Sequence, residues 1–333
     1  MQTFAELAAQ APFGDGRVTL GFAFDLWFLP APVVQGVFEQ VKNSGVKTIT
    51  THHLKIPYTC SGGPNGVPKL LKELELLDER MIISHANGSD KEEMNLIKAN
   101  GAHISSTPST ELHMGMGRPV CFDASFLDGG ANGKLAGNQD VASLGIDCHT
   151  NNAGSIVSEA RLGLQNARNH FNEHYHRQGK AASRLSNDLS VEAAFNLATV
   201  KGAEAVRMER EIGRIEQGFK ADLIIFDALS PSMLGAAQHD PVAAIILHSS
   251  PADIETVIVN GVVRKENGSL APVTVDRAMS AGIEEATLEW REISKRVLQS
   301  RKRMQKEIEM IDLSAEKQVF MQVMQVDQSA LVE

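Results

Sequence analysis

The sequence predicts an α/β fold of the (β/α)8 barrel type, followed by a small β unit and a C-terminal helix. Short apolar runs alternate with helical stretches through the first half of the chain, a pattern that is typical of βαβ units and a parallel sheet. Ionisable residues follow directly on several apolar runs, and the carboxyl ends of barrel strands carry the active sites of such folds. Glycine turns and β-branched hairpin runs come only after this region.

Composition and charge exclude several classes of protein. The chain has 333 residues, of which 43% are apolar and 22% charged, as expected for a globular protein with a sizeable core. A net charge of −9 without a basic stripe argues against a nucleic-acid partner. The sequence has no apolar run long enough to span a bilayer, no signal peptide and only three cysteines, so we expect no membrane partner and a reducing, cytoplasmic location.

Helices and loops separate the predicted strands. The first predicted helix follows Pro30 and Pro32 and ends at Ser44-Gly45, which fits the preference for proline in a first turn and glycine beyond a last turn. The stretches 107–119 and 125–138 are predicted to be loops. Strands are predicted at 17–29 (running into a loop), 46–51, 80–84, 102–106 and 141–146, and helices at 33–43, 69–77, from Ser89-Asp90 to Ala99, 155–168 and 190–206.

The centre of the predicted site is the stretch 141–152. Its apolar run ends in Gly145-Ile146 and delivers Asp147 at the tip, and polar residues follow at once. Taken alone, Asp147 is interpreted as a turn aspartate or a helix cap. Ionisable residues also follow the other predicted strands: Asp25, His52 and His53, and His85. Each histidine alone has an ordinary explanation as a polar residue, but histidine and carboxylate are the usual ligands of Zn²⁺, so the strand ends together predict a metal site.

The last third of the chain has a different sequence pattern. Two β-branched runs meet at Asn260-Gly261, a strong signal for a hairpin with a type I′ turn. Residues 276–311 are predicted to form one long charged helix with an apolar face through Trp290 and Val297. Its basic residues are interpreted as a solvated or docking face, and the apolar face leaves a homo-oligomer open. The predicted domains are 1–210, 211–272 and 273–333.

Several motifs of the chain together resemble one family. They are Ile82-Ile-Ser-His85-Ala-Asn87, Gly101 to Gly117, Leu144-Gly-Ile-Asp147, Ala198 to Val206, Gly213 to Asp227 and Val257 to Gly261. These motifs resemble the amidohydrolase superfamily, in its deaminase and chlorohydrolase-like branch. The first three resemble the family's sixth barrel strand, its seventh strand with the substrate loop, and its eighth-strand aspartate motif. The fourth resembles the closing helix, and the last two resemble the returning β-sandwich. The resemblance covers most of residues 17–264, and its two most specific segments are structural.

The resemblance implies a hydrolase that uses metal-activated water on a carbon–nitrogen or carbon–halogen bond. It implies that Asp147 binds a divalent metal, Zn or Fe, and shuttles the proton. His52 or His53 would be the fifth-strand ligand, and we favour His52. His85 would polarise the leaving group or the carbonyl, as in the deaminase branch.

Two loop residues are candidate contacts for a small-molecule substrate. Glu111 and His113 lie in the segment that resembles the family's substrate loop, although an exposed loop glutamate is the simpler reading of Glu111. The expected function is hydrolysis of a non-peptide carbon–nitrogen bond in a small cyclic molecule.

The chain departs from the family pattern in two respects. No His-X-His pair precedes the first predicted strand, and the first three barrel strands and the N-terminal part of the sandwich have no counterpart, so we expect an N-terminally incomplete barrel. The glutamate expected three residues after the fifth-strand histidine is replaced by Lys55 or Ile56. A metal would then have few ligands. These departures leave an alternative open: a truncated form, an inactive paralogue serving as a binding module, or a half-barrel completed by a partner chain.

Overall fold

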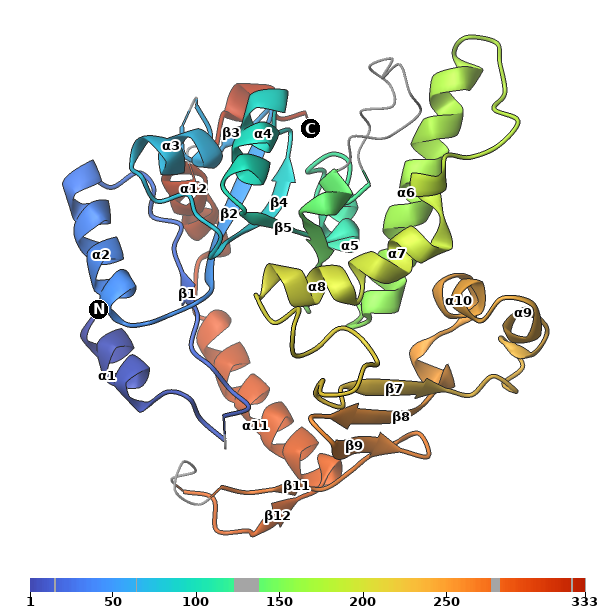
Figure 1. The fold of residues 1–333 in the computed structure, drawn as a ribbon. Coiled ribbons are helices and arrows are strands. Elements are labelled where there is room, and N and C mark those ends of the chain that lie inside the picture. The colour runs from blue at the N-terminus through green and yellow to red at the C-terminus, as the bar shows by residue number, and fades with distance from the viewer. Residues whose placement is uncertain (15, 64, 123–137, 277–281, 325, 333) are drawn as a thin grey trace. The chain divides into compact units, whose positions relative to one another are not determined.

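The computed structural model describes residues 1–333 except 15, 64, 123–137, 277–281, 325 and 333 (Figure 1). The described chain forms two compact units. The first comprises Met1–Ile56, Cys60–Lys220 and Asp227–Asp253, and the second comprises Pro57–Thr59, Ala221–Phe226 and Ile254–Glu333. The predicted loop at 125–138 falls, up to residue 137, outside the described residues. The three-domain division at residues 210 and 272 stays a prediction.

The first unit is organised around a parallel sheet with the strand order β1-β2-β4-β5-β6. The strands are β1 (Phe22–Ala23), β2 (Ile49–Ile56), β4 (Met81–Asn87), β5 (His103–Ser106) and β6 (Ala142–Leu144), and the short strand β3 is Thr59–Cys60. Each described pair along this order is parallel. The predicted α/β fold with a parallel sheet is therefore confirmed, and the carboxyl ends of its strands lie at one edge.

The strand boundaries differ from the sequence prediction in ways that matter for the site. β2 begins at Ile49 and continues to Ile56, so His52 and His53 lie within the strand and not beyond it. Burial alternates along it, with Ile49, Thr51 and His53 buried and His52 exposed, as the two-residue period of a strand requires. The predicted strand at 17–29 contains only the two residues of β1.

Helices connect these strands. The N-terminal helices are α1 (Gln2–Gln10), α2 (Ala31–Asn43), α3 (Val67–Glu73), α4 (Lys91–Ala99) and α5 (Pro108–His113), and those after the sheet are α6 (Ile156–His176), α7 (Val191–Leu197), α8 (Val200–Ala205), α9 (Leu234–His239) and α10 (Pro241–Ala243). α5 corrects the prediction of a continuous loop at 107–119. The predicted helix at 190–206 is two helices, because the Thr199 backbone leaves the helical region, with φ −131° and ψ −94°.

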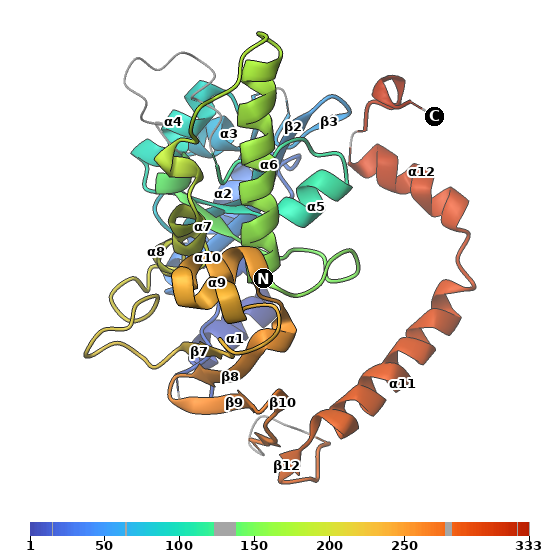
Figure 2. The same cartoon turned by 90° about the vertical axis from the view of Figure 1, so that its right-hand side faces the viewer.

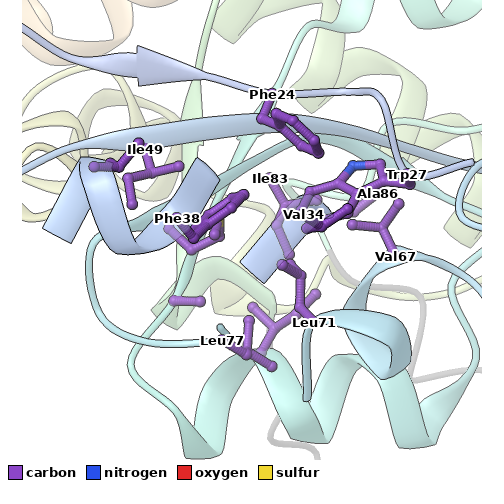
Figure 3. Close-up of a cluster of buried hydrophobic side chains, with 14 of the residues drawn as sticks. Phe24, Trp27, Val34, Phe38, Ile49, Val67, Leu71, Leu77, Ile83 and Ala86 are labelled. Carbon is purple, nitrogen blue, oxygen red and sulfur yellow. The ribbon is translucent and has the colours of Figure 1, made fainter. Parts of the chain in front are cut away.

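The core of the first unit consists of two apolar clusters. One cluster joins α2 and α3 to β1, β2 and β4 through side chains such as Phe38, Leu71 and Ile83, the last two fully buried (Figure 3). Phe24 and Trp27 close it, with ring centroids 4.8 Å apart in an edge-to-face arrangement. The second cluster packs α6 and α7 against β6, and α6 is the long helix that dominates the view in Figure 2. Burial on both sides of the sheet fixes its register.

The second unit contains an antiparallel sheet with the strand order β10-β9-β8-β7. Its strands are β7 (Leu223–Phe226), β8 (Ile254–Val259), β9 (Val262–Glu266) and β10 (Ser269–Leu270), and a separate pair is β11 (Val273–Thr274) with β12 (Thr287–Leu288). The predicted hairpin is present, and its turn residues Asn260 and Gly261 have φ of 47° and 78°, as a type I′ turn requires. Assignment of this sheet to the family's β-sandwich stays a prediction.

The C-terminal helix is shorter than predicted, and a second helix follows it. α11 spans Trp290–Ile308 and α12 spans Leu313–Val323, so the helix predicted at 276–311 is too long at both ends among the described residues, and α12 was not predicted. Residues 277–281 of the predicted helix lie outside the described residues. Asp312 separates α11 from α12. Its carboxylate accepts the backbone N–H groups of Ser314 and Ala315 and so caps the start of α12. No helix within the described ranges has the length and apolar character that a bilayer crossing needs.

A capping box fixes the start of α4 beside the end of β4. The Asp90 carboxylate accepts the Glu93 N–H at 2.9 Å, and the Glu93 carboxylate accepts the Asp90 N–H at 2.8 Å. We expect Asp90→Ala to lower the free energy of unfolding by about 1–2 kcal/mol, because the cap is lost. Urea denaturation measures this. Glu92→Ala in the same first turn is the control, and a loss as large as that of Asp90→Ala would contradict the capping argument.

Candidate functional site

Three side chains meet at the carboxyl edge of the parallel sheet. They come from three different strands: His52 from β2, His85 from β4 and Asp147 from the segment after β6. One potential ligand atom from each lies within 4.8 Å of the other two. The rings of His52 and His85 have centroids 5.5 Å apart, and His85 Nε2 lies 3.9 Å from Asp147 Oδ2. The parallel sheet thus brings together residues that are up to 95 positions apart in the sequence.

His52 is held by Asp25, which follows β1. Asp25 Oδ2 lies 2.8 Å from His52 Nδ1, and Asp25 Oδ1 accepts the His52 backbone N–H at 2.7 Å. Burial acts to raise the pKa of Asp25, but the hydrogen bonds from the His52 ring and backbone outweigh it and lower that pKa. The same ring hydrogen bond raises the pKa of His52. With Nδ1 occupied, Nε2 is the nitrogen of His52 that is left for a ligand.

His85 is held from the opposite side of the group. Its side chain is 4% exposed, and its Nδ1 lies 3.0 Å from Thr107 Oγ1 and 3.6 Å from Glu111 Oε1. Its Nε2 faces Asp147. Both histidines therefore have a polar partner on Nδ1 and present Nε2, which is how proteins orient imidazole ligands of metals.

Glu111 is fully buried, so its interpretation as an exposed loop glutamate is wrong. Its carboxylate accepts the Thr107 N–H at 2.7 Å and the Ser106 hydroxyl at 3.0 Å. These bonds and the contact with His85 engage its oxygens, so Glu111 holds the site residues in place, and its contact with a substrate stays a prediction. His113 is exposed at the end of α5, and its substrate contact stays a prediction.

His53 does not join the group, because it lies on the other face of β2. It is fully buried, its Nδ1 accepts the Val67 N–H at 3.4 Å, and its Nε2 lies 3.6 Å from Glu93 Oε1. Burial, reinforced by Lys55, lowers the pKa of His53 to about 4, so the ring is neutral at pH 7. The sequence could not separate His52 from His53, and the alternation of β2 corrects the assignment of His53 as a metal ligand.

We expect His53→Ala to destabilise the protein by about 1–3 kcal/mol. The substitution removes a fully buried ring and leaves the Val67 N–H without its acceptor. Thermal or urea unfolding measures the change. His113→Ala is the matched control at an exposed histidine and is expected to change stability by less than about 0.5 kcal/mol. Equal effects of the two substitutions would refute a core role for His53.

A bulge in β4 aims His85 at the group. The Cα pairing between β2 and β4 goes from His53↔His85 to Leu54↔Asn87, so Ala86 is an extra residue on β4. His85, Ala86 and Asp147 have φ of 71°, 61° and 60°, a left-handed backbone that non-glycine residues rarely adopt. Such backbone strain concentrates at functional sites, and here it coincides with the donor group.

Asp25 was expected at a strand end, but the sequence did not reveal its contact with His52. The contact of Thr107 with His85 was not predicted either. The signal for Asp25 was weak, because its partner His52 is 27 positions away and the pairing of β1 with β2 had to be known first. The signal for Glu111 was available: Pro108 and Glu111 are a proline and an acid in a first helical turn, which predicts the start of α5.

Known proteins match this chain over more than half of its length. The model of the Amidohydrolase family matches residues 35–264. A 5-methylthioadenosine/S-adenosylhomocysteine deaminase of Acetivibrio thermocellus is 30% identical over 223 residues, which are 67% of this chain and 44% of that protein. An S-triazine hydrolase of Gordonia rubripertincta is 24% identical over 249 residues, which are 74% of this chain and 47% of that protein. The chain spans about half the length of these curated relatives.

Solved structures show the same fold. A zinc-bound adenosine deaminase from Xanthomonas campestris has a TM-score of 0.62 at 18% identity, covering 83% of this chain and 58% of that one. A mutant atrazine chlorohydrolase from Arthrobacter aurescens, complexed with zinc and atraton, also has a TM-score of 0.62, at 21% identity, covering 83% of this chain and 56% of that one. Because the family model matches more than half of its residues, the chain belongs to the amidohydrolase family.

Proposed function

We propose that this protein is a metal-dependent hydrolase that acts on a non-peptide carbon–nitrogen bond of a small, cyclic molecule. The observation that carries the proposal is the group of His52, His85 and Asp147, whose donor atoms lie within 4.8 Å of one another at the carboxyl edge of the sheet. Two imidazoles and a carboxylate are a typical donor set for Zn²⁺ and for iron.

The residues present fit such an ion. His52 and His85 each have Nδ1 engaged, by Asp25 and by Thr107 with Glu111, which leaves both Nε2 atoms for the ion. Asp147, partly exposed, supplies an oxygen at the rim of the group. Three protein ligands would leave room for a water molecule on a four-coordinate ion, as in catalytic rather than structural zinc sites.

The chemistry then follows from the roles of the side chains. A bound divalent ion supplies Lewis acidity that lowers the pKa of water toward neutrality. Asp147 takes the proton from the attacking water and passes it to the leaving nitrogen, as a general base and then a general acid. His85 would hold the ion through Nε2 if its proton is on Nδ1, whereas the polarising role implied by the resemblance would require the proton on Nε2. The Glu111 carboxylate 3.6 Å from Nδ1 favours the first arrangement.

The substrate class rests on the relatives. Their names describe deamination of adenosine-type molecules and hydrolysis of triazines, and both kinds of molecule contain an aromatic ring with several nitrogen atoms. We propose a substrate of this kind for the present chain.

The test combines metal content with hydrolysis. The purified chain of residues 1–333 from metal-replete medium is expected to contain about one equivalent of Zn or Fe by elemental mass spectrometry. It is expected to release ammonia from at least one amino-substituted purine nucleoside or amino-triazine, to lose this activity on dialysis against a chelator, and to regain it with Zn²⁺. Metal-free protein from such medium would overturn the proposal.

The same experiment decides on the alternative of an inactive relative. Bound metal without hydrolysis of any compound in the panel would overturn the proposed activity and favour a binding module. The comparisons give this alternative no support, since the relatives described above carry names of enzymes.

A further inference from the structure

Asp25 connects the edge of the sheet to the donor group through two separate hydrogen bonds. Its Oδ2 is 2.8 Å from the Nδ1 of His52, and its Oδ1 accepts the backbone N–H of the same residue at 2.7 Å. The side chain is thus bonded to both ends of His52, which restricts rotation of the ring about its side-chain torsions. Asp25 itself offers no donor when ionised, so His52 Nδ1 has to carry the proton of the shared bond.

The carboxylate of Asp25 is in turn fixed from the core. The Thr51 hydroxyl donates to Asp25 Oδ1 at 3.1 Å, and the Trp27 indole N–H donates to Thr51 Oγ1 at 2.7 Å. Trp27 and Thr51 are buried, and Trp27 packs on Phe24 in the apolar cluster of Figure 3. The chain Trp27–Thr51–Asp25–His52 therefore runs from a rigid core to a half-exposed imidazole.

We propose that Asp25 is a positioning residue that holds His52 as the Nδ1–H tautomer and thereby directs the Nε2 lone pair into the group formed with His85 and Asp147. This inference rests on the proposed metal-dependent function. Carboxylate partners of this kind typically strengthen metal binding about 10- to 100-fold.

The two oxygens of Asp25 make the proposal sharply testable. In Asp25→Asn the amide oxygen is held at the Oδ1 position, because the His52 N–H and the Thr51 hydroxyl both need an acceptor there. The amide NH₂ then faces His52 Nδ1 and donates to it. The His52 proton moves to Nε2, and a protonated nitrogen cannot bind a metal. In Asp25→Ala, by contrast, the ring is free to adopt either tautomer.

The experiment measures zinc affinity of the full chain by competition with a chromophoric chelator. We expect affinity to fall about 100-fold in Asp25→Asn and only about 10-fold in Asp25→Ala. Histidine ¹⁵N spectra of the metal-free protein, assigned with His52→Gln, are expected to show the Nδ1–H tautomer in the wild type and the Nε2–H tautomer in Asp25→Asn. Asp78→Asn is the matched control, since Asp78 is a partly buried aspartate paired with Arg80 at the start of β4, and its zinc affinity should equal that of the wild type.

The outcomes separate this inference from the proposed function. Wild-type protein that fails to bind zinc overturns both. Zinc binding that is unchanged in Asp25→Asn overturns the inference alone. If Asp25 has only a structural role, Asp25→Ala should lower zinc affinity at least as much as Asp25→Asn does. The tautomer of His52 should then be the same in the wild type and in Asp25→Asn. This result would also overturn the inference. Thermal unfolding of the metal-free variants shows whether each is folded.

Discussion

Asp147→Ala is expected to abolish stoichiometric metal binding and to lower the hydrolytic rate on the order of 10³-fold. Asp147 is the only carboxylate in the group with His52 and His85 described here, so its removal leaves the two imidazoles without a carboxylate ligand in that group. Two ligands hold a divalent ion far more weakly than three or four. Elemental mass spectrometry and an ammonia-release assay on the same preparations measure both effects.

Two further variants separate the metal-binding role of Asp147 from its proton-transfer role and from a nonspecific effect. Asp147→Asn keeps an oxygen ligand but cannot carry a proton, so it should retain part of the metal while losing activity as fully as Asp147→Ala. Cys148→Ser changes the half-buried neighbouring residue, whose thiol contacts Thr150, and should leave metal content at the wild-type level. Full metal occupancy in Asp147→Ala would show that the ion is held elsewhere.

Gly88→Ala is expected to have the largest effect on stability, a loss of about 2–5 kcal/mol. Gly88 has φ of +75°, and a Cβ atom built on it would lie 1.8 Å from the carbonyl oxygen of Lys55. The left-handed backbone costs an alanine about 1–2 kcal/mol, and the overlap adds about 1–3 kcal/mol because backbone has to move. Urea denaturation of the wild type and the variant measures the difference.

The matched control is Gly63→Ala. Gly63 has nearly the same φ, +76°, but a Cβ atom there has open space around it. Its loss should be confined to about 1–2 kcal/mol. Equal losses of unfolding free energy at the two glycines would show that β2 and β4 can separate at their carboxyl ends at little cost. A larger loss at Gly88 would show that the close approach of Lys55 and Gly88 keeps together the strands that carry His52 and His85.

Much of the first unit could be predicted from its apolar runs. The predicted strand at 102–106 begins one residue before β5 and ends with it, whereas the strand predicted at 80–84 begins one residue before β4 and ends three residues too early. The start of β4 was predictable because Met81, Ile82 and Ile83 form an apolar run that is buried. The end of β2 was missed, since hydrogen bonding to β4 extends it over polar residues that have no strand pattern of their own. The second C-terminal helix, α12, was not predicted, because the helical apolar pattern was followed only to Ile311 and Asp312 was not recognised as a cap.

The candidate site was predictable only in part, for a physical reason. Parallel strands place their carboxyl ends at one edge, so His85 and Asp147 could be expected near each other from the sequence. The choice between His52 and His53 depends on which face of β2 is buried, and a shift of one residue exchanges the two faces. The partners of the histidines, Asp25 and Thr107, come from neighbouring strands and could be found only once the register was known.

The extra residue in β4 affects which changes of chain length the site can tolerate. Ala86 lies between two regular pairings, so deleting it would restore an unbroken ladder and transfer Asn87 to the opposite face of the sheet. Inserting a residue before His85 would turn the imidazole away from Asp147 in the same manner. Point substitutions in the surrounding loops leave this geometry intact, whereas single-residue insertions and deletions between Met81 and Asn87 do not. Length variation is therefore expected in the loops beyond the strands, where it would not move the donor group.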